Sequence, residues 1–381
     1  MQGKYTAPLV GGLVTLLSSV SVNAAGLSLS QIATTESIAM AGVAGVTNNR
    51  DSSAMVTNPA GLTGIEDSSY LLGAQVIIVD AEFNNNLGDA SSSSTTPIPH
   101  LSYAQRVNDK WVLGGSVHAP GGLGLEYKNG LFGANTPTVV NESAIEIVDF
   151  TFAAAYQLDE NWSLGAAVIA QYASIDMQLL EGTSFANNLS DQDINFAFSL
   201  GAQYQLDNWL VGISYKSGSD HEFSYDGMFP APSALTWPQI VDIGVSYQAT
   251  ERTQLSFSMN WQEWSASGDS LGYQYQDTYG VGIAIRHQLD EWVLMAGASY
   301  DSSPIDTAAD RTIDLPLDSQ WRIGFGAEKK IWGDKWLGIA YQYSDLGQAD
   351  ILMTGPGGIN TLVEGSYSKN RAHFITASLR Y

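Results

Sequence analysis

The stretch from Ala25 to Leu62 reads AGLSLSQIATTESIAMAGVAGVTNNRDSSAMVTNPAGL, and it lies ahead of every strand-like segment of the chain. It is rich in Ala, Gly, Ser and Thr, holds few large apolar residues, and contains a short helix-like run at Ile38–Val46. A closed sheet of strands leaves an interior that a segment of small residues can fill. We therefore predict a plug, residues 25–68, inside a barrel formed by residues 69–381.

The rest of the chain is a series of strand-like segments joined by two kinds of connection. The short, polar connections are Asn108–Lys110, Asp159–Asn161, Asp207–Asn208, Thr250–Arg252, Asp290–Glu291 and Gly333–Lys335. The longer ones are Asn84–Pro99, Pro120–Asn141, Leu180–Asp191, Phe223–Thr236, Ser265–Gly272, Ser302–Leu315 and Gly347–Gly365. Short turns on one side and long loops on the other are typical of bacterial outer-membrane barrels. The sequence predicts an all-β fold, a transmembrane antiparallel β-barrel of about fourteen strands with an N-terminal plug (hatch) containing short helices, and a first strand at Ser69–Glu82.

The residues within these segments alternate in polarity. In Tyr273–Arg286 the apolar side chains fall on one face, and Gln, Thr, Gly, Ala and Arg fall on the other. This period of two suits a wall with lipid on one side and a wet or plugged lumen on the other, although a soluble sandwich also alternates. Tryptophans that directly follow short turns predict an aromatic girdle at one membrane interface. They are Trp111, Trp162, Trp209, Trp292 and Trp336.

Composition agrees with a membrane barrel. Charged residues make up only 14% of the chain, its mean hydropathy is −0.04, and no run reaches the about 18 apolar residues of a membrane helix. The net charge of −23, with only 16 Lys and Arg, argues against a nucleic-acid partner. The chain has no cysteine, which excludes disulfides and thiolate metal sites, and no cofactor is predicted.

The ends of the sequence indicate export and insertion into the outer membrane. Residues 1–24 combine Lys4, a short apolar run and the small-residue site Val22-Asn23-Ala24, which predicts a cleaved signal peptide. The terminal Tyr381 resembles the last-strand signal by which the barrel-assembly machinery recognises its clients. We expect outer-membrane lipid and lipopolysaccharide around the barrel.

Two segments are candidates for function. Asn58-Pro59-Ala60 is either a joint of the hatch beside a ligand or only its anchor to the wall, since Pro restricts the backbone and Asn caps it. Ala119, Pro120, Gly121 and Gly122 predict a bulge or break in the third strand, because Pro cannot donate to a sheet and Gly weakens it. This is either a strand end followed by a loop or an opening for an apolar ligand.

Catalytic and metal sites find little support. Neither the H-E-x-x-H motif nor the G-x-S-x-G motif occurs in the sequence. The five histidines are dispersed along the chain, at His100, His118, His221, His287 and His373. A Ser–His pair across strands, as in a barrel lipase, stays open. The loop Asn187–Asp193 offers oxygen ligands for weak calcium binding, but a solvated loop explains it equally well.

Several segments resemble the FadL-type outer-membrane transporters, which take up long-chain fatty acids or aromatic hydrocarbons. The resemblance rests on the hatch, including Ala25-Gly26-Leu27, Asp51–Ala54 and Asn58–Leu62. It also rests on Trp261–Ser265, on Tyr300-Asp301-Ser302-Ser303-Pro304, and on Leu315-Pro316-Leu317-Asp318, where one residue is inserted relative to the family's Leu-Pro-Asp.

The resemblance implies a fourteen-stranded barrel with a ligand pocket beside the hatch. Movement of the hatch N-terminus at Ala25, Gly26 and Leu27 would open a lateral path through a kinked third strand. The outer loops Leu180–Asp191 and Phe223–Thr236 are shorter than those that form the first ligand groove in fatty-acid members. The fourth outer loop still carries apolar residues that would collect a ligand; the alternative is that they are aromatic residues of the membrane interface. These residues are Phe223, Tyr225, Met228, Phe229 and Trp237.

The sequence therefore predicts a passive outer-membrane transporter of hydrophobic molecules, with long-chain fatty acids as the first expectation and no enzymatic activity. The alternatives are an aromatic hydrocarbon channel of the same family, and a plugged porin or surface receptor.

Overall fold

The computed structural model describes residues 31–85, 88–126, 140–179, 187–224, 233–311, 316–354 and 361–381. Predicted features outside these ranges are the signal peptide, the hatch residues Ala25, Gly26 and Leu27, and the loop residues Tyr225, Met228 and Phe229. Within the described ranges, no helix has the length and apolar character needed to cross a membrane.

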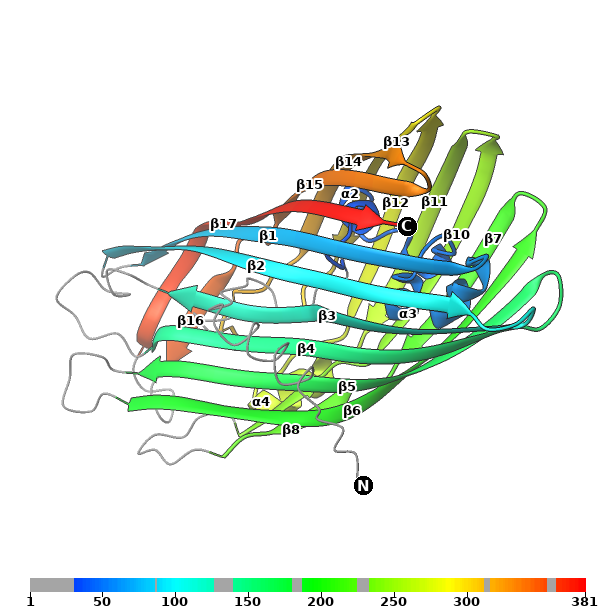
Figure 1. Ribbon diagram of the computed structural model, residues 1–381. Coiled ribbons are helices and arrows are strands. Elements are labelled where there is room, and N and C mark those ends of the chain that lie inside the picture. The colour runs from blue at the N-terminus through cyan, green and yellow to red at the C-terminus, as the bar shows by residue number, and fades with distance from the viewer. Residues whose placement is uncertain are drawn as a thin grey trace, which may run out of the picture.

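Fourteen antiparallel strands form a closed barrel (Figure 1), as the alternating pattern predicted. The strands of the wall, in chain order, are β1 Ser68–Asn85, β2 Gly88–Arg106, β3 Trp111–Glu126, β4 Val140–Gln157, β5 Trp162–Leu179, β6 Asn187–Leu206, β7 Trp209–Lys216, β10 Ile240–Thr250, β11 Thr253–Gln262, β12 Thr278–Leu289, β13 Trp292–Asp301, β14 Gln320–Trp332, β15 Lys335–Asp345 and β17 Thr361–Arg380. Closure comes from β1, which pairs with β17 from Leu71↔Arg380 to Asn85↔Gly365.

Additional elements lie at the end of the barrel that carries the longer connections, here called the outer end. A small hairpin forms from β8 Ser219–Glu222 and β9 Ala234–Trp237, and helix α4 spans Trp264–Leu271. Strand β16, Asp350–Thr354, pairs only with β17. The six short connections all lie at the opposite end, as predicted.

Within residues 31–68, the described part of the hatch contains four short helical turns inside the barrel. They are α2 Thr35–Ala39, η1 Gly45–Thr47, α3 Ala54–Thr57 and η2 Pro59–Gly64. Ile38, Met40 and Val43 of the hatch are buried against the inner face of the wall, where Ile77, Val293 and Phe374 lie. Small inward residues on the strands let the hatch approach the wall closely, so one apolar core joins the two.

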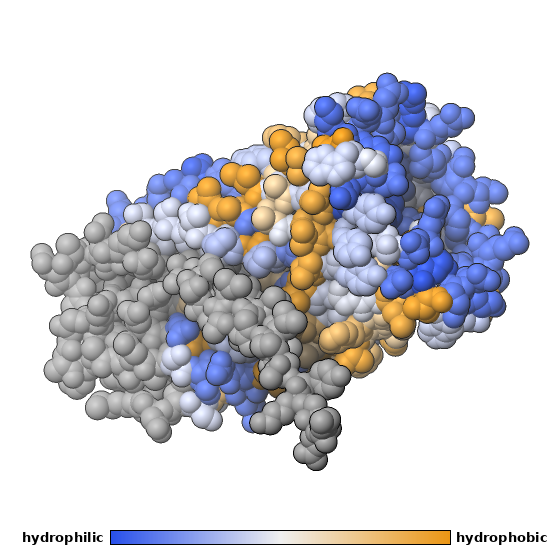
Figure 2. Space-filling view, in the orientation of Figure 1, coloured by the Kyte–Doolittle hydropathy of each residue, from blue (hydrophilic) through white to orange (hydrophobic). Residues whose placement is uncertain are grey.

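The outer face of the wall is apolar. On β12, Tyr279, Val281 and Ile283 are exposed, while the intervening Gly280 and Gly282 are buried. Figure 2 shows hydrophobic residues across the middle of the molecule and hydrophilic residues at the end with the short turns. Trp111, Trp162, Trp209 and Trp292 are each the first residue of a strand and are exposed, whereas Trp336 is half-buried beside Arg380.

Several predicted boundaries were wrong. Strand β3 continues to Glu126 inside the predicted loop Pro120–Asn141, and β6 begins at Asn187 inside the predicted loop Leu180–Asp191. Asn84–Pro99 is no loop, because β1 continues to Asn85 and β2 begins at Gly88, with pairs from Asn85↔Gly88 to Ser68↔Gln105. Its Ser and Thr residues alternate between buried and exposed positions, so a polar composition hid a strand period. The predicted strand Tyr273–Arg286 starts only at Thr278, and Tyr275 is buried among residues of the outer end.

Candidate functional site

The hatch segment Asn58-Pro59-Ala60 is held against the wall by the side chain of Asn58. Its Nδ2 donates to the carbonyl oxygens of Val46 (2.9 Å), Ala202 (3.2 Å) and Ile213 (3.2 Å). Its Oδ1 accepts from the backbone N–H of Ala60 at 3.1 Å, which caps η2. Asn58 is fully buried, so every polar atom of this side chain is committed to holding the hatch.

Two glycines of the wall make this close approach possible. A Cβ at Gly201 would lie 2.0 Å from Asn58 Oδ1, and one at Gly165 would lie 2.3 Å from the backbone nitrogen of Ala60. Both distances are shorter than any real contact, so no larger residue fits without moving the hatch. The geometry is that of the anchor, one of the two roles predicted for this segment.

A charged cluster ties the hatch to the wall from the side of the short turns. Glu36 of α2 forms an ion pair with Arg50, and Arg286 of β12 lies 3.8 Å from the same carboxylate. Burial alone would raise the pKa of Glu36, but the guanidinium groups of Arg50 and Arg286 outweigh burial and hold that pKa below its ordinary value of 4.5. Glu36 is therefore ionised at neutral pH.

Strand β3 is irregular at the residues predicted to break it. Its pairing with β4 shifts between His118↔Asp149 and Gly121↔Ile147, which leaves one extra residue on β3 around Ala119 and Pro120. Pairing of β3 with β2 ends at Leu101↔Val117. Beyond that point each of the two strands keeps its other neighbour, and Figure 1 shows β2 and β3 separating toward the outer end. We call this place the β2–β3 parting.

Prolines explain why the two strands part there. Pro97 and Pro99 lie on β2 just beyond its last pair with β3, and Pro120 lies on β3. Proline has no N–H to donate and is confined to strand edges and bulges. Pro120 was singled out from the sequence, whereas Pro97 and Pro99 were missed because their segment was interpreted as a loop.

An apolar cluster lies at the outer end of the lumen. Phe223 and Trp237, from the fourth outer loop, are buried and do not form an exposed collecting surface. Their neighbours come from β4, β5, α4 and the outer loops, and include Ile147, Ile175, Trp264, Tyr275, Ile305 and Leu317. A hydrophobic ligand that enters from outside would therefore meet packed apolar side chains, not a polar channel.

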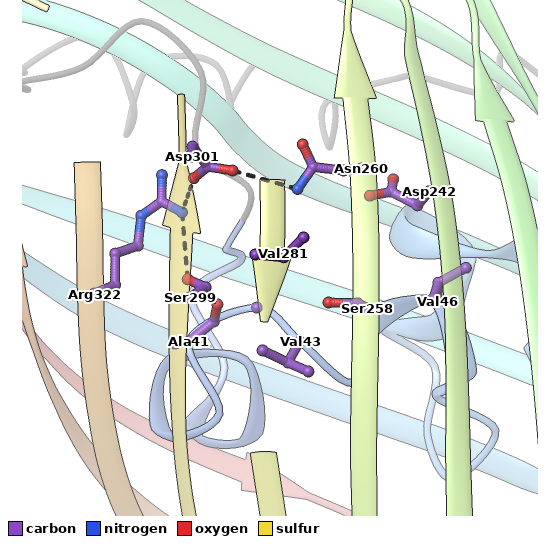
Figure 3. A pocket seen from close by; sticks show the side chains of 11 residues that line it. Ala41, Val43, Val46, Asp242, Ser258, Asn260, Val281, Ser299, Asp301 and Arg322 are labelled. Carbon is purple, nitrogen blue, oxygen red and sulfur yellow. Dashed lines mark hydrogen bonds and ion pairs between the residues drawn. The ribbon is translucent and has the colours of Figure 1, made fainter. Parts of the chain in front are cut away.

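The cavity beside the hatch is small and polar (Figure 3). Its volume is about 40 Å³, and Asp242, Asn260, Asp301 and Arg322 line it together with hatch residues such as Val43. Asp301 forms an ion pair with Arg322 and accepts from Asn260 Nδ2 at 3.4 Å. An apolar cavity that holds benzene is roughly 150 Å³. This cavity therefore does not serve as the apolar ligand pocket that the resemblance implies.

A buried polar network lies beside the β2–β3 parting, and sequence reasoning missed it. Asp149 of β4 is fully buried and accepts from Lys216 Nζ and Gln171 Nε2, each at 2.6 Å. His118 Nε2 lies 3.7 Å from the same carboxylate, and Gln171 Oε1 lies 3.1 Å from His221 Nε2. The alternation of β3 puts His118 on the inner face, which is the one signal that the sequence offers for this network.

Metal binding finds no support in the described part of the chain, where no group of three His, Cys, Asp or Glu side chains could hold an ion. Asn187–Asp193, the segment considered for calcium as a loop, lies entirely in strand β6, and Asp193 Oδ2 lies 3.2 Å from His221 Nδ1.

Comparison with known proteins agrees with an outer-membrane barrel. The family described as "Outer membrane protein transport protein (OMPP1/FadL/TodX)" matches residues 15–381. Outer membrane protein P1 of Haemophilus influenzae is 23% identical, over 86% of this chain and 87% of that protein. The long-chain fatty acid transport protein of Escherichia coli K12 is 20% identical, over 78% of this chain and 83% of that protein.

Solved structures share the fold. A Pseudomonas aeruginosa FadL homologue superimposes with a TM-score of 0.79 and 18% identity, covering 93% of this chain and 99% of that one. The Pseudomonas putida toluene transporter TodX superimposes with a TM-score of 0.69 and 19% identity, covering 91% of this chain and 97% of that one.

Proposed function

The chain belongs to the outer membrane protein transport family (OMPP1/FadL/TodX) and is an integral barrel of the outer membrane, and from this premise we propose that it takes up hydrophobic small molecules and releases them sideways through the β2–β3 parting. Family members are transport channels, not enzymes. The ligand enters among the apolar side chains of the outer lumen and leaves into the bilayer without passing through the hatch.

The end of β2–β3 pairing at Leu101↔Val117 carries this proposal. A barrel normally has no edges, because every strand is paired on both sides. Here two neighbouring strands each present an edge toward the outer end, at the level of the bulge in β3. An apolar molecule loses nothing by moving from an apolar lumen to lipid through such an edge, whereas a route through water would cost about 25 cal/mol for each Å² of apolar surface.

The anchored hatch supports a sideways route. Asn58 bonds the hatch to β6 and β7, and Glu36 pairs with Arg286 of β12. A hatch held in this way stands across an axial route and favours release through the wall. Long-chain fatty acids, the first expectation from the sequence, and monoaromatic hydrocarbons such as toluene are the two ligand classes to test, because proteins similar to this chain are named for both.

Cross-linking tests the lateral route. The sequence has no native cysteine, so in a double-cysteine variant only the two introduced thiols can react. Pro97→Cys with Ala119→Cys places thiols on the two sides of the parting, to be joined by a bifunctional methanethiosulfonate. The matched control, Ile78→Cys with Thr95→Cys, joins residues already paired between β1 and β2.

Radiolabelled oleate and toluene are tested separately, and for each one that cells carrying the protein take up, we expect the cross-link across the parting to abolish uptake and reduction to restore it. The control cross-link leaves uptake unchanged. Unchanged uptake with the parting closed would rule out lateral release. Ion conductance in planar bilayers without uptake above protein-free cells would instead favour the plugged porin.

A further inference from the structure

Unpartnered polar atoms are concentrated at the β2–β3 parting. Seven buried side-chain atoms on β2, β3 and β4 have no hydrogen-bond partner among the described residues. They are the hydroxyl oxygens of Ser92, Ser94, Thr96, Ser116 and Thr151 and the Nδ1 atoms of His100 and His118. A buried polar group without a partner costs about 1–3 kcal/mol, so such a concentration calls for a functional explanation.

His100 and His118 stand at the first position where β2 and β3 no longer pair. The last pair is Leu101↔Val117, so the two histidines occupy the next positions on their strands. Their ring centroids are 6.2 Å apart, and their exposed fractions are only 2% and 4%. Both lie on the inner face of the wall, one from each side of the parting.

The other ring nitrogen of each histidine faces a polar group of the protein. His100 Nε2 lies 3.2 Å from Ser102 Oγ, which lies 2.8 Å from Ser52 Oγ of the hatch. His118 Nε2 faces Asp149 at 3.7 Å. A carboxylate partner favours the tautomer with hydrogen on Nε2, which leaves Nδ1 of His118 as an acceptor. His100 is free to carry its hydrogen on Nδ1 and to donate.

The charges around the parting disfavour an anionic ligand. Every described cation at the outer end has a carboxylate partner within 4.0 Å. These pairs are Lys216 with Asp149, Arg311 with Asp318, Arg322 with Asp301, Lys369 with Glu82 and Arg371 with Asp80. A ligand carboxylate would therefore be desolvated beside Asp149 with no cation of its own.

We propose that His100 and His118 form a binding subsite for the uncharged hydroxyl head of an amphiphile whose apolar tail occupies the outer lumen. A hydroxyl is both donor and acceptor, so one group can donate to His118 Nδ1 and accept from His100 Nδ1–H. The subsite deepens the proposed uptake function and rests on it. It would hold the head at the parting while the tail moves into lipid, and would favour alcohols and phenols over carboxylates.

The test compares three probes of one chain length on the full barrel in lipid nanodiscs, with empty nanodiscs subtracted: dodecane, 1-dodecanol and dodecanoate at pH 8. We expect dodecanol to bind about fivefold or more tightly than dodecane, since one hydrogen bond is worth about 1 kcal/mol. Dodecanoate should bind most weakly. Dodecanoate binding more tightly than dodecanol would overturn the subsite.

Variants separate the subsite from a structural role. His100→Phe and His118→Phe should each remove the preference for dodecanol and leave dodecane affinity within about twofold. His100→Asn and His118→Asn, whose amides place polar atoms near Nδ1, should restore part of it. His287→Phe is the matched control, since His287 is a half-buried wall histidine whose Nδ1 lies 2.9 Å from Thr253 Oγ1, away from the parting.

Four results overturn the proposal. An unchanged dodecanol preference in both Phe variants means that the histidines bind no head group. Equal losses for dodecanol and dodecane mean that the polar atoms only hold water or support the wall. No binding of any probe above empty nanodiscs removes the uptake function itself, whereas dodecane binding without any dodecanol preference removes only the subsite.

Discussion

The side-chain nitrogen of Asn58 in the hatch lies 3.2 Å from the carbonyl oxygen of Ala202 in strand β6. The same nitrogen lies 3.2 Å from the carbonyl oxygen of Ile213 in β7, so this hatch residue contacts two neighbouring strands of the wall. The hatch is therefore held against the wall by hydrogen bonds as well as by apolar packing. Directional hydrogen bonds explain why a segment of small residues keeps one position in the lumen.

Asn58→Ala should loosen that position. The substitution removes one amide and leaves the carbonyl oxygens of Val46, Ala202 and Ile213 with one donor fewer, so we expect the free energy of unfolding to fall by about 1–3 kcal/mol. Urea unfolding of the barrel in lipid vesicles measures it. Asn49→Ala, on a partly exposed hatch residue, is the control and should change stability by less than about 0.5 kcal/mol.

Gly201→Ala should displace the hatch from the side of the wall. The new methyl group would lie 2.0 Å from Asn58 Oδ1, and overpacking of this kind costs about 1–3 kcal/mol. Amide hydrogen exchange at Ala60, whose N–H is held by Asn58, should become faster. Gly115→Ala is the matched control, because its methyl group has no neighbour closer than 3.6 Å, and equal exchange rates in the two variants would contradict the close contact.

Hatch docking should weaken in acid through Glu36. The pKa of Glu36 is depressed in the folded state, so its ion pairs stabilise the fold above the ordinary value of 4.5 and are lost as the pH falls through the depressed value. Glu36→Gln should lower the free energy of unfolding by about 2 kcal/mol at neutral pH, since it leaves Arg50 and Arg286 without their anion. In the variant, the free energy of unfolding should also fall less steeply as the pH is lowered. Parallel curves for the variant and the natural chain would show that Glu36 does not control this loss of stability.

Deletion of Pro120 should narrow the parting from the β3 side, although Pro97 and Pro99 remain on β2. It removes the extra residue that shifts β3 against β4 and lets the register run without interruption past His118↔Asp149. We expect the barrel to fold and uptake of oleate or toluene to drop toward the level of the cross-linked parting. Pro120→Gly keeps the extra residue and should keep uptake, so a loss of uptake in both variants would show that proline itself, and not the bulge, is needed.

The barrel class could be predicted from local patterns because each pattern belongs to a single strand or turn. The alternation of Tyr279, Val281 and Ile283 with Gly280 and Gly282 indicates one strand. The tryptophans that follow short turns indicate one end of the barrel. Prediction was wrong where composition and period disagree, as in the Ser- and Thr-rich part of β2.

The amino-acid sequence by itself determined the class of fold, the number of strands, the place of the plug and the position of the irregularity in β3, because these follow from periodicity and from what proline and glycine do to their own backbone. Only the tertiary structure decided that β2 and β3 part at Leu101 and Val117, that Asn58 bonds to β6 and β7, and that His100 and His118 face each other. These are relations between separate strands, and their free energies depend on which backbone and side-chain groups meet across the closed barrel, which no single segment specifies.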